Sequence, residues 1–223
     1  PLTHEAQAEC RFMLLSPNNL LKPSDGGPVA VPSQDMVLGI YYLTQERGTT
    51  VGDGREEPGE GKAFKNLNEA ILAYENKALT MHARITVRMS KKLADGTVVT
   101  GNVSSTLGRL IFNEIIPQDL GYVDRTKPEN ELAPEIDFHV GKKQLKQILE
   151  KVINTHGATK TAEVLDDIKA MGYHYSTIAA MTVSISDMTV PPQKPELIAQ
   201  AEETVDKIAR SEERRVGKEG RSR

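Results

Sequence analysis

The pattern of apolar positions predicts a series of helices and one pair of strands. The strongest signal lies in Pro28–Thr44, where two prolines fix an extended approach to an apolar helical stripe. Ser33 stands where a helix N-cap is expected, and Asp35 follows in the first turn, where the helix dipole favours a negative charge. A short buried helix is therefore predicted to begin after Ser33. Its buried face is predicted to comprise Met36, Val37, Ile40 and Tyr41.

The same spacing predicts helices elsewhere in the chain. Thr3 is placed to cap the first of them, and Asn66 with Glu69 resembles a capping box. Glycine and proline mark several of the ends. The predicted helices lie in Pro1–Ser16, in Asn66–Ala78, from Ser104–Thr106 to Pro117, in Lys142–His156 before Gly157, in Thr159–Met171 before Gly172, and from Pro195 to Ile208.

Between Met81 and Met89 the period changes to two, because apolar residues alternate with polar ones. The dipeptide Asp95-Gly96 is typical of a hairpin turn, and Thr97–Val103 is predicted to return as the partner strand. By contrast, Asp119–Val140 has no sustained period and is predicted to be irregular. The fold class is therefore α+β, mainly helical with one small antiparallel β-hairpin sheet.

The polar face of the predicted strand is a candidate contact surface. Arg84 and Arg88 share this face with His82, and the alternation predicts that all three are exposed. A solvated strand face explains them, and contact with RNA, DNA or another subunit is the alternative. Asp137 and His139 could pair as metal ligands, but no third ligand stands at a suitable spacing, so we predict no metal site in this chain.

Composition limits the classes of protein. Hydrophobic residues make up 38% and charged residues 26%, which is ordinary for a soluble protein, and no apolar run is long enough to span a membrane. The formal net charge of −3 gives no overall attraction to nucleic acid. Cys10 is the single cysteine, which excludes an internal disulfide and a multi-cysteine zinc site; it is predicted to be a small core residue.

Several long segments together carry a family resemblance. PSQDMVLGIYYLT, TLGRLIFNEIIP and ISDMTVPPQKPELIAQAEETVDKI occur in this order, and the first is flanked by PLTHEAQAECRFMLLSPNNLLKP and GEGKAFKNLNEAILAYENKALTMHARITVR. The chain resembles the bacterial RNA polymerase β′ subunit, just after its catalytic aspartate motif, over roughly Pro1–Ile208. It departs from the family at Ala180, where glycine is usual. The start of the chain also looks like a cut from a longer protein.

The resemblance implies a domain organisation. The tail is charged and nearly without apolar residues, which predicts disorder, and it does not resemble the family, so we expect it to be non-native sequence. The expected parts are 1–45, the end of the active-centre domain; 46–190, the pore or secondary-channel domain; 191–209, the start of a coiled coil at the pore rim; and 210–223, the tail.

The resemblance also implies a function, DNA-templated RNA synthesis by a nucleotidyltransferase complex. Ser33 and Gln34 are expected nearest the incoming nucleotide. The magnesium ions of such chemistry need clustered carboxylates, and we expect these aspartates and their Mg²⁺ outside this chain. Expected partners are other polymerase subunits, template DNA, transcript RNA, nucleoside triphosphates and elongation factors that enter the pore, with no membrane. We expect a cytoplasmic, nucleoid-associated protein. A non-catalytic scaffold or regulator that reuses the domain is the alternative.

Overall fold

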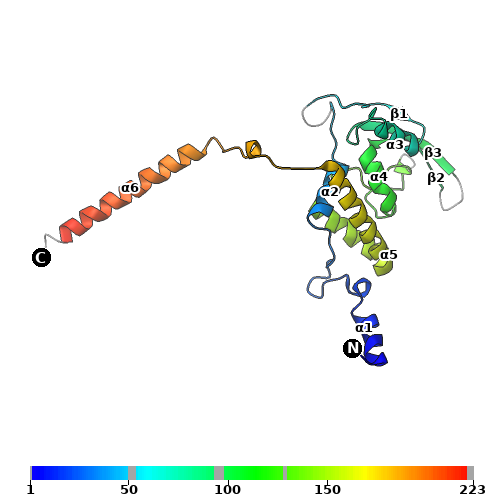
Figure 1. The fold of residues 1–223 in the computed structure, drawn as a ribbon, viewed down its shortest axis with the longest axis horizontal. Coiled ribbons are helices and arrows are strands. Elements are labelled where there is room, and N and C mark those ends of the chain that lie inside the picture. The colour runs from blue at the N-terminus through cyan, green and yellow to red at the C-terminus, as the bar shows by residue number, and fades with distance from the viewer. Residues whose placement is uncertain (1, 50–53, 93–97, 128–129, 220–223) are drawn as a thin grey trace. The chain divides into compact units, whose positions relative to one another are not determined.

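The computed structural model describes residues 2–49, 54–92, 98–127 and 130–219 (Figure 1). The chain divides into two compact units, Pro1–Ala180 and Met181–Arg223, which are described separately. The fold is α+β and mainly helical, as predicted. The boundaries that the resemblance implies at residues 45, 190 and 209 stay predictions.

A three-stranded sheet lies in the first unit. β2 (Arg84–Lys92) and β3 (Val98–Thr106) pair antiparallel, so the predicted hairpin is confirmed, although its turn at Asp95-Gly96 lies outside the described residues. β1 (Ala63–Phe64) pairs parallel with the other side of β2, which gives the order β1-β2-β3. β1 was not predicted because two residues are too short to show a period.

Two helices cover the apolar face of this sheet. α3 (Leu67–Glu75) begins at Asn66, whose side chain accepts from the backbone N–H of Glu69 at 2.8 Å, as the capping pattern predicts. α4 (Leu107–Ile115) follows β3 directly, and the hydroxyl of Thr106 accepts from the N–H of Arg109 at 3.3 Å. Their apolar side chains form one core with the inward side chains of the strands, including Ala70, Leu79, Ile85, Val87, Val103, Leu107 and Leu110.

α2 (Asp35–Thr44) and α5 (Lys142–Ala179) form the second core of this unit. Gly157 interrupts α5 with φ 76° and ψ −175°, so α5 consists of two arms, which lie side by side in Figure 1. The predicted end of a helix at Gly157 is confirmed. Apolar residues from both arms share the core with α2, among them Ile40, Leu43, Leu145, Ile148, Leu149, Val164 and Ile168.

The second arm of α5 is longer than predicted. Gly172 does not end the helix, which continues to Ala179. Gly172 is instead buried against the backbone of Met36 in α2, where any side chain would collide. The glycine therefore serves close helix packing rather than termination. Ala180 ends α5 in the left-handed conformation, with φ 46° and ψ 41°.

The N-terminal part comprises α1 (His4–Met13) and a short 3₁₀ helix, η1 (Ser16–Asn19). The predicted cap is confirmed, because the hydroxyl of Thr3 accepts from the N–H of Ala6 at 3.3 Å. The prediction of a core role for Cys10 is wrong. No residue of α1 is buried, and Cys10 is only half-buried.

The second unit contains η3 (Ile185–Asp187) and α6 (Lys194–Glu219). The helix predicted from Pro195 is present, and its apolar residues, such as Leu197 and Val205, are exposed. The tail, residues 210–223, is predicted to be disordered, but the structure differs over its first ten residues, where α6 continues to Glu219. Arginine, glutamate and lysine are good helix formers, so a charged tail can extend an existing helix. Residues 220–223 lie outside the described part.

Candidate functional site

A strained turn precedes α2. Gln34 has φ 49° and ψ −122°, and the N–H of Met36 donates to the carbonyl of Ser33 at 3.2 Å. These values are close to those of the first central residue of a type II′ turn, a position that glycine favours. A non-glycine residue in such a region costs of order 1–3 kcal/mol and is held there by its surroundings. The turn presents both Ser33 and Gln34 at the surface, where both are exposed.

The prediction that Ser33 caps this helix is wrong. α2 begins at Asp35, so Gln34 occupies the cap position, and no side chain accepts from the first helical N–H groups. Ser33 contributes its backbone carbonyl rather than its hydroxyl, because the turn at Gln34 separates it from the helix. Neither the hydroxyl of Ser33 nor the amide of Gln34 is therefore committed to capping.

A network of ion pairs lies at the other end of α2. Glu46 accepts from Arg109 of α4 at 2.7 Å and from Arg84 of β2 at 2.9 Å. Asp137 adds a contact of 3.4 Å to Arg84 and one of 3.5 Å to Arg109. The hydroxyl of Ser105 donates to Asp137 at 2.5 Å. The network thus joins the end of α2 to β2, β3, α4 and the irregular segment.

The two arginines of the network differ in burial. The side chain of Arg109 is 6% exposed, and its Nε also donates to the carbonyl of Thr44 at 3.1 Å. The side chain of Arg84 is 39% exposed. The hydrogen bond to Glu46 raises the pKa of Arg84, against an opposing effect of burial. Arg109 therefore forms the buried side of the network, and Arg84 forms its more exposed side.

The predicted polar strand face is only partly as expected. Arg88 is exposed, whereas Arg84 is half-buried and paired with Glu46 and Asp137. The prediction that His82 shares an exposed face is wrong. His82 precedes β2 and is 4% exposed. Its ring lies perpendicular to the Tyr42 ring, with centroids 4.6 Å apart, and its Nδ1 lies 3.2 Å from the carbonyl of Gln45.

The structure does not bring the two sets of predicted site residues together. Ser33 and Gln34 precede α2, and the partners of Arg84 lie beyond its other end. A ten-residue helix is about 15 Å long, so the two places are separated by at least that distance. A metal site is not formed either: among the described residues, no three His, Cys, Asp or Glu side chains are grouped to hold an ion.

Asp137 and His139, the two residues weighed as metal ligands, point to different partners. Asp137 belongs to the ion-pair network, and the Nε2 of His139 lies 3.1 Å from the carbonyl of Tyr41. The rings of His139 and Tyr41 are 4.2 Å apart. Both residues therefore attach the irregular segment to α2 and β3.

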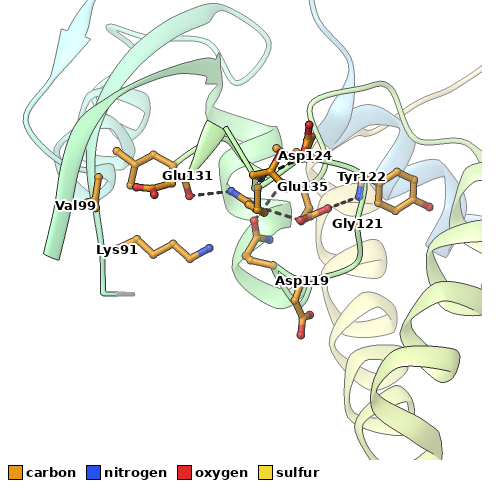
Figure 2. A pocket seen from close by; sticks show the side chains of 13 residues that line it. Lys91, Val99, Asp119, Gly121, Tyr122, Asp124, Glu131 and Glu135 are labelled. Carbon is orange, nitrogen blue, oxygen red and sulfur yellow. Dashed lines mark hydrogen bonds and ion pairs between the residues drawn. The ribbon is translucent and has the colours of Figure 1, made fainter. Parts of the chain in front are cut away.

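A pocket of about 860 Å³ opens between the irregular segment and the sheet (Figure 2). The carboxylate of Glu135 lies at its base with no exposed side-chain surface, and it accepts from the N–H of Tyr122 at 2.8 Å and from Arg125 at 3.2 Å. Lys91 reaches into the pocket from the end of β2 (Figure 2). The Nε of Arg125 is buried and has no hydrogen-bond partner among the described atoms.

Sequence reasoning did not find Glu46, Arg109 or Glu135. Arg109 left a signal, because it interrupts the apolar stripe of α4 between Leu107 and Leu110. A charge inside a buried stripe requires a partner. That partner, Glu46, lies 63 residues away in the sequence, so spacing alone could not identify it.

Comparison with known proteins shows which family the chain resembles. The family described as RNA polymerase Rpb1, domain 3, matches residues 19–188. A DNA-directed RNA polymerase subunit beta′ from Lachnoclostridium phytofermentans is 65% identical over 214 residues, covering 96% of this chain and 16% of the relative. The same subunit from Clostridium acetobutylicum is 57% identical over 208 residues, covering 93% of this chain and 17% of the relative.

The resemblance to β′ subunits is thereby confirmed. The chain spans 16–17% of the length of these relatives. Within the described ranges, no helix combines the length and the apolar character needed to cross a bilayer. The chain belongs to the RNA polymerase Rpb1, domain 3, family.

Proposed function

We propose that the chain acts as part of the β′ subunit of a DNA-directed RNA polymerase and takes part in DNA-templated RNA synthesis. The identity of 65% with one β′ subunit, sustained over 96% of the chain, is the observation that carries this proposal. The partners would then be the other polymerase subunits, template DNA, transcript RNA and nucleoside triphosphates, with elongation factors entering the pore.

We further propose that the first unit forms a wall of the active centre and of the nucleotide-entry pore. A wall must hold its surface groups in fixed positions, and the two cores and the Glu46 network supply that rigidity. The strained turn before α2 would then present Ser33 and Gln34 to the passing nucleotide. Strained backbone conformations are frequent at sites of this kind.

The arginine surface belongs to the same proposal. Arg88 is exposed on β2 and is the better candidate for a contact with nucleic acid or with another subunit. Arg84 would contribute less, because Glu46 and Asp137 already neutralise it. The described residues do not fit a magnesium site, since no three potential ligands are grouped. We propose that the catalytic aspartates and their Mg²⁺ belong to parts of the polymerase outside this chain.

A chimeric subunit tests the proposal. Residues 1–209 of this chain would replace the matching segment of the Lachnoclostridium phytofermentans β′ subunit, and the polymerase would be assembled and assayed for templated RNA synthesis. We expect assembly and RNA synthesis close to those of the parent enzyme. The control is the same chimera with Gly39→Val, which should fail to pack α2 against α5. A chimera that assembles but makes no RNA would contradict the proposal and favour a non-catalytic scaffold.

A further inference from the structure

The direction of the backbone groups in the sheet can be worked out from two hydrogen bonds. The carbonyl of Arg84 accepts from the N–H of Gly61, and the N–H of Thr86 donates to the carbonyl of Lys62. Arg84 and Thr86 thus direct their backbone groups toward β1. Successive residues of a strand direct these groups to opposite sides, so the residues between them face β3. In this register, the backbone groups that point toward β3 are those of Ile85, Val87, Met89 and Lys91. Their partners are Ser105, Val103, Gly101 and Val99.

The alternate residues of β3 direct their backbone groups away from β2. Thr100, Asn102 and Ser104 direct both their N–H and C=O groups to the outer side, where β3 has no further strand. Within the described part of the chain, none of these groups makes a hydrogen bond to a backbone group outside the sheet. An unpaired strand edge of this kind is a template for another strand.

A groove of about 640 Å³ runs along this edge. It is lined by six consecutive residues of β3, from Val99 to Ser104. Because successive side chains of a strand point to opposite faces, a groove that touches all six runs along the edge rather than over one face. Its opposite wall is the irregular segment, with Tyr122–Asp124, Asn130 and Leu132–Pro134.

The groove adjoins the pocket of Figure 2, with which it shares Val99, Tyr122, Val123, Asp124 and Leu132. Together they combine apolar and acidic surface. Two cationic side chains line them, against five carboxylates: Lys91 and Arg125, and Asp119, Asp124, Glu131, Glu135 and Asp137. Three of these carboxylates already have partners: Asp137 contacts Arg84 and Arg109, Glu135 contacts Arg125, and Asp119 contacts His156. Among the described lining residues, Asp124 and Glu131 then stand against Lys91, so the lining favours a ligand with apolar groups and a positive charge.

We propose that this groove binds an extended segment of a protein partner that carries lysine or arginine among apolar residues, and that the segment adds to β3 as a fourth strand. Main-chain hydrogen bonds to Thr100, Asn102 and Ser104 provide the affinity in this mode, and the pockets for alternate side chains provide the specificity. This surface is independent of the role proposed for the turn at Gln34.

The test uses the full 223-residue chain and a fluorescein-labelled octapeptide of alternating valine and lysine, with binding followed by fluorescence anisotropy. We expect saturable binding. A peptide with methyl groups on alternate amide nitrogens, which cannot pair at an edge, should bind at least about tenfold more weakly. A peptide of alternating valine and glutamate should also bind more weakly, by a similar factor, because the groove is acidic.

Two variants of one residue separate the edge from its side chain. Asn102→Pro removes an outward N–H that β2 does not use, and proline is tolerated at such edge positions. It should weaken binding of the valine–lysine peptide by about tenfold. Asn102→Ala keeps the N–H and should change the affinity by less than about twofold. Circular dichroism melts check that both variants fold. If Asn102→Pro does not fold, the methylated peptide still tests main-chain pairing, because it is measured with the unsubstituted chain.

Other outcomes would overturn the inference. Equal binding of the methylated and unmethylated peptides, or no binding of the valine–lysine peptide, would exclude strand addition. Displacement of the peptide by single-stranded RNA would assign the groove to nucleic acid. Sedimentation of the chain as a dimer that Asn102→Pro makes monomeric would assign the edge to a second copy of the chain.

Discussion

Gly39 of α2 and Gly172 of α5 pack backbone against backbone. A Cβ on Gly39 would overlap the carbonyl oxygen of Gly172 and would lie 2.8 Å from the N–H nitrogen of Ser176. A Cβ on Gly172 would lie 2.6 Å from the carbonyl oxygen of Met36. The two helices can approach this closely only because both residues are glycine. The position of the turn before α2 depends on the same contact.

Gly39→Ala should destabilise the chain despite the better helix propensity of alanine. The propensity gain is about 1 kcal/mol, whereas overpacking against backbone atoms that cannot rotate away costs about 1–3 kcal/mol or more. Because the added Cβ would overlap a backbone oxygen, the cost lies toward the upper end of this range, and we expect a net loss of about 1–2 kcal/mol in the free energy of unfolding, measured by urea titration. Gly27→Ala is the control, since its Cβ would meet only the Asp25 side chain, at 3.4 Å. An unchanged urea midpoint for Gly39→Ala would show that the helices separate easily.

Ala180→Gly should stabilise the chain. Ala180 ends α5 with φ 46°, a conformation that costs an alanine roughly 1 kcal/mol and costs glycine little. The neighbouring substitution Ala179→Gly lies within the helix and should destabilise by about 0.5–1 kcal/mol. The two adjacent substitutions should therefore change the free energy of unfolding in opposite directions, as measured by urea titration. A loss of stability in both variants would mean that α5 does not end at Ala180.

Local signals in the sequence predicted most of the helices. Thr3 and Asn66 cap the helices that they were expected to cap, because a cap depends on residues within one turn. Ser33 has the same chemistry but does not cap α2, because Gln34 adopts a positive φ that its residue type does not predict. Gly172 also carries a helix-end signal, which its contact with Met36 overrides.

The candidate site was less predictable than the fold. Alternation predicted that Arg88 is exposed and that Ile85 and Val87 are buried, but it failed for His82, which lies before the strand begins. The pair of Arg109 and Glu46 depends on a contact between distant segments. Periodicity describes which face of an element is buried, and it does not identify the partner of a buried charge.

Arg109 and Arg84 should differ in their contribution to stability although they share Glu46. Arg109→Met leaves Glu46, whose side chain is 11% exposed, without its buried partner, and we expect a loss of about 3 kcal/mol. Arg84→Met removes a guanidinium that is 39% exposed and should cost no more than about 1 kcal/mol. Urea titration of both variants checks the order. Equal losses would show that Arg84 is as much a part of the interior as Arg109.

His82 should make the chain less stable in mild acid. Its ordinary pKa is 6.5, and burial lowers the folded-state pKa, with the charge of Arg47 as a second cause. The unfolded chain therefore binds a proton at a higher pH than the folded chain does. The contribution of neutral His82 is fully present above about pH 6.5 and is lost as the pH falls toward the lowered pKa.

Urea titrations at about pH 7.5 and about pH 5 measure this effect. The parent chain should lose more stability between the two values than His82→Gln, which cannot be protonated. Groups other than His82 contribute equally to both proteins, so the difference between them isolates this residue. An identical pH dependence in the two proteins would mean that His82 is protonated as readily when folded as when unfolded.

The proposed function leads directly to a prediction for Gln34. Its amide is exposed and makes no capping contact, so it is free to bond an incoming nucleotide. In an assembled polymerase that carries this chain in β′, Gln34→Ala should remove one hydrogen bond to the substrate. The loss is worth about 0.5–1.5 kcal/mol, which raises the KM for nucleotide roughly 2- to 13-fold in steady-state elongation.

Gln34→Gly is the matched variant, because glycine also lacks the amide but accepts φ 49° without strain. If the amide binds nucleotide, both variants should raise the KM by a similar factor, while only Gln34→Gly should raise the melting temperature of the chain. If the strained turn matters instead, the two variants should differ in KM, because only one of them relaxes the backbone. An unchanged KM in both variants, with the fold intact, would exclude Gln34 from nucleotide binding and leave its exposed amide as ordinary surface.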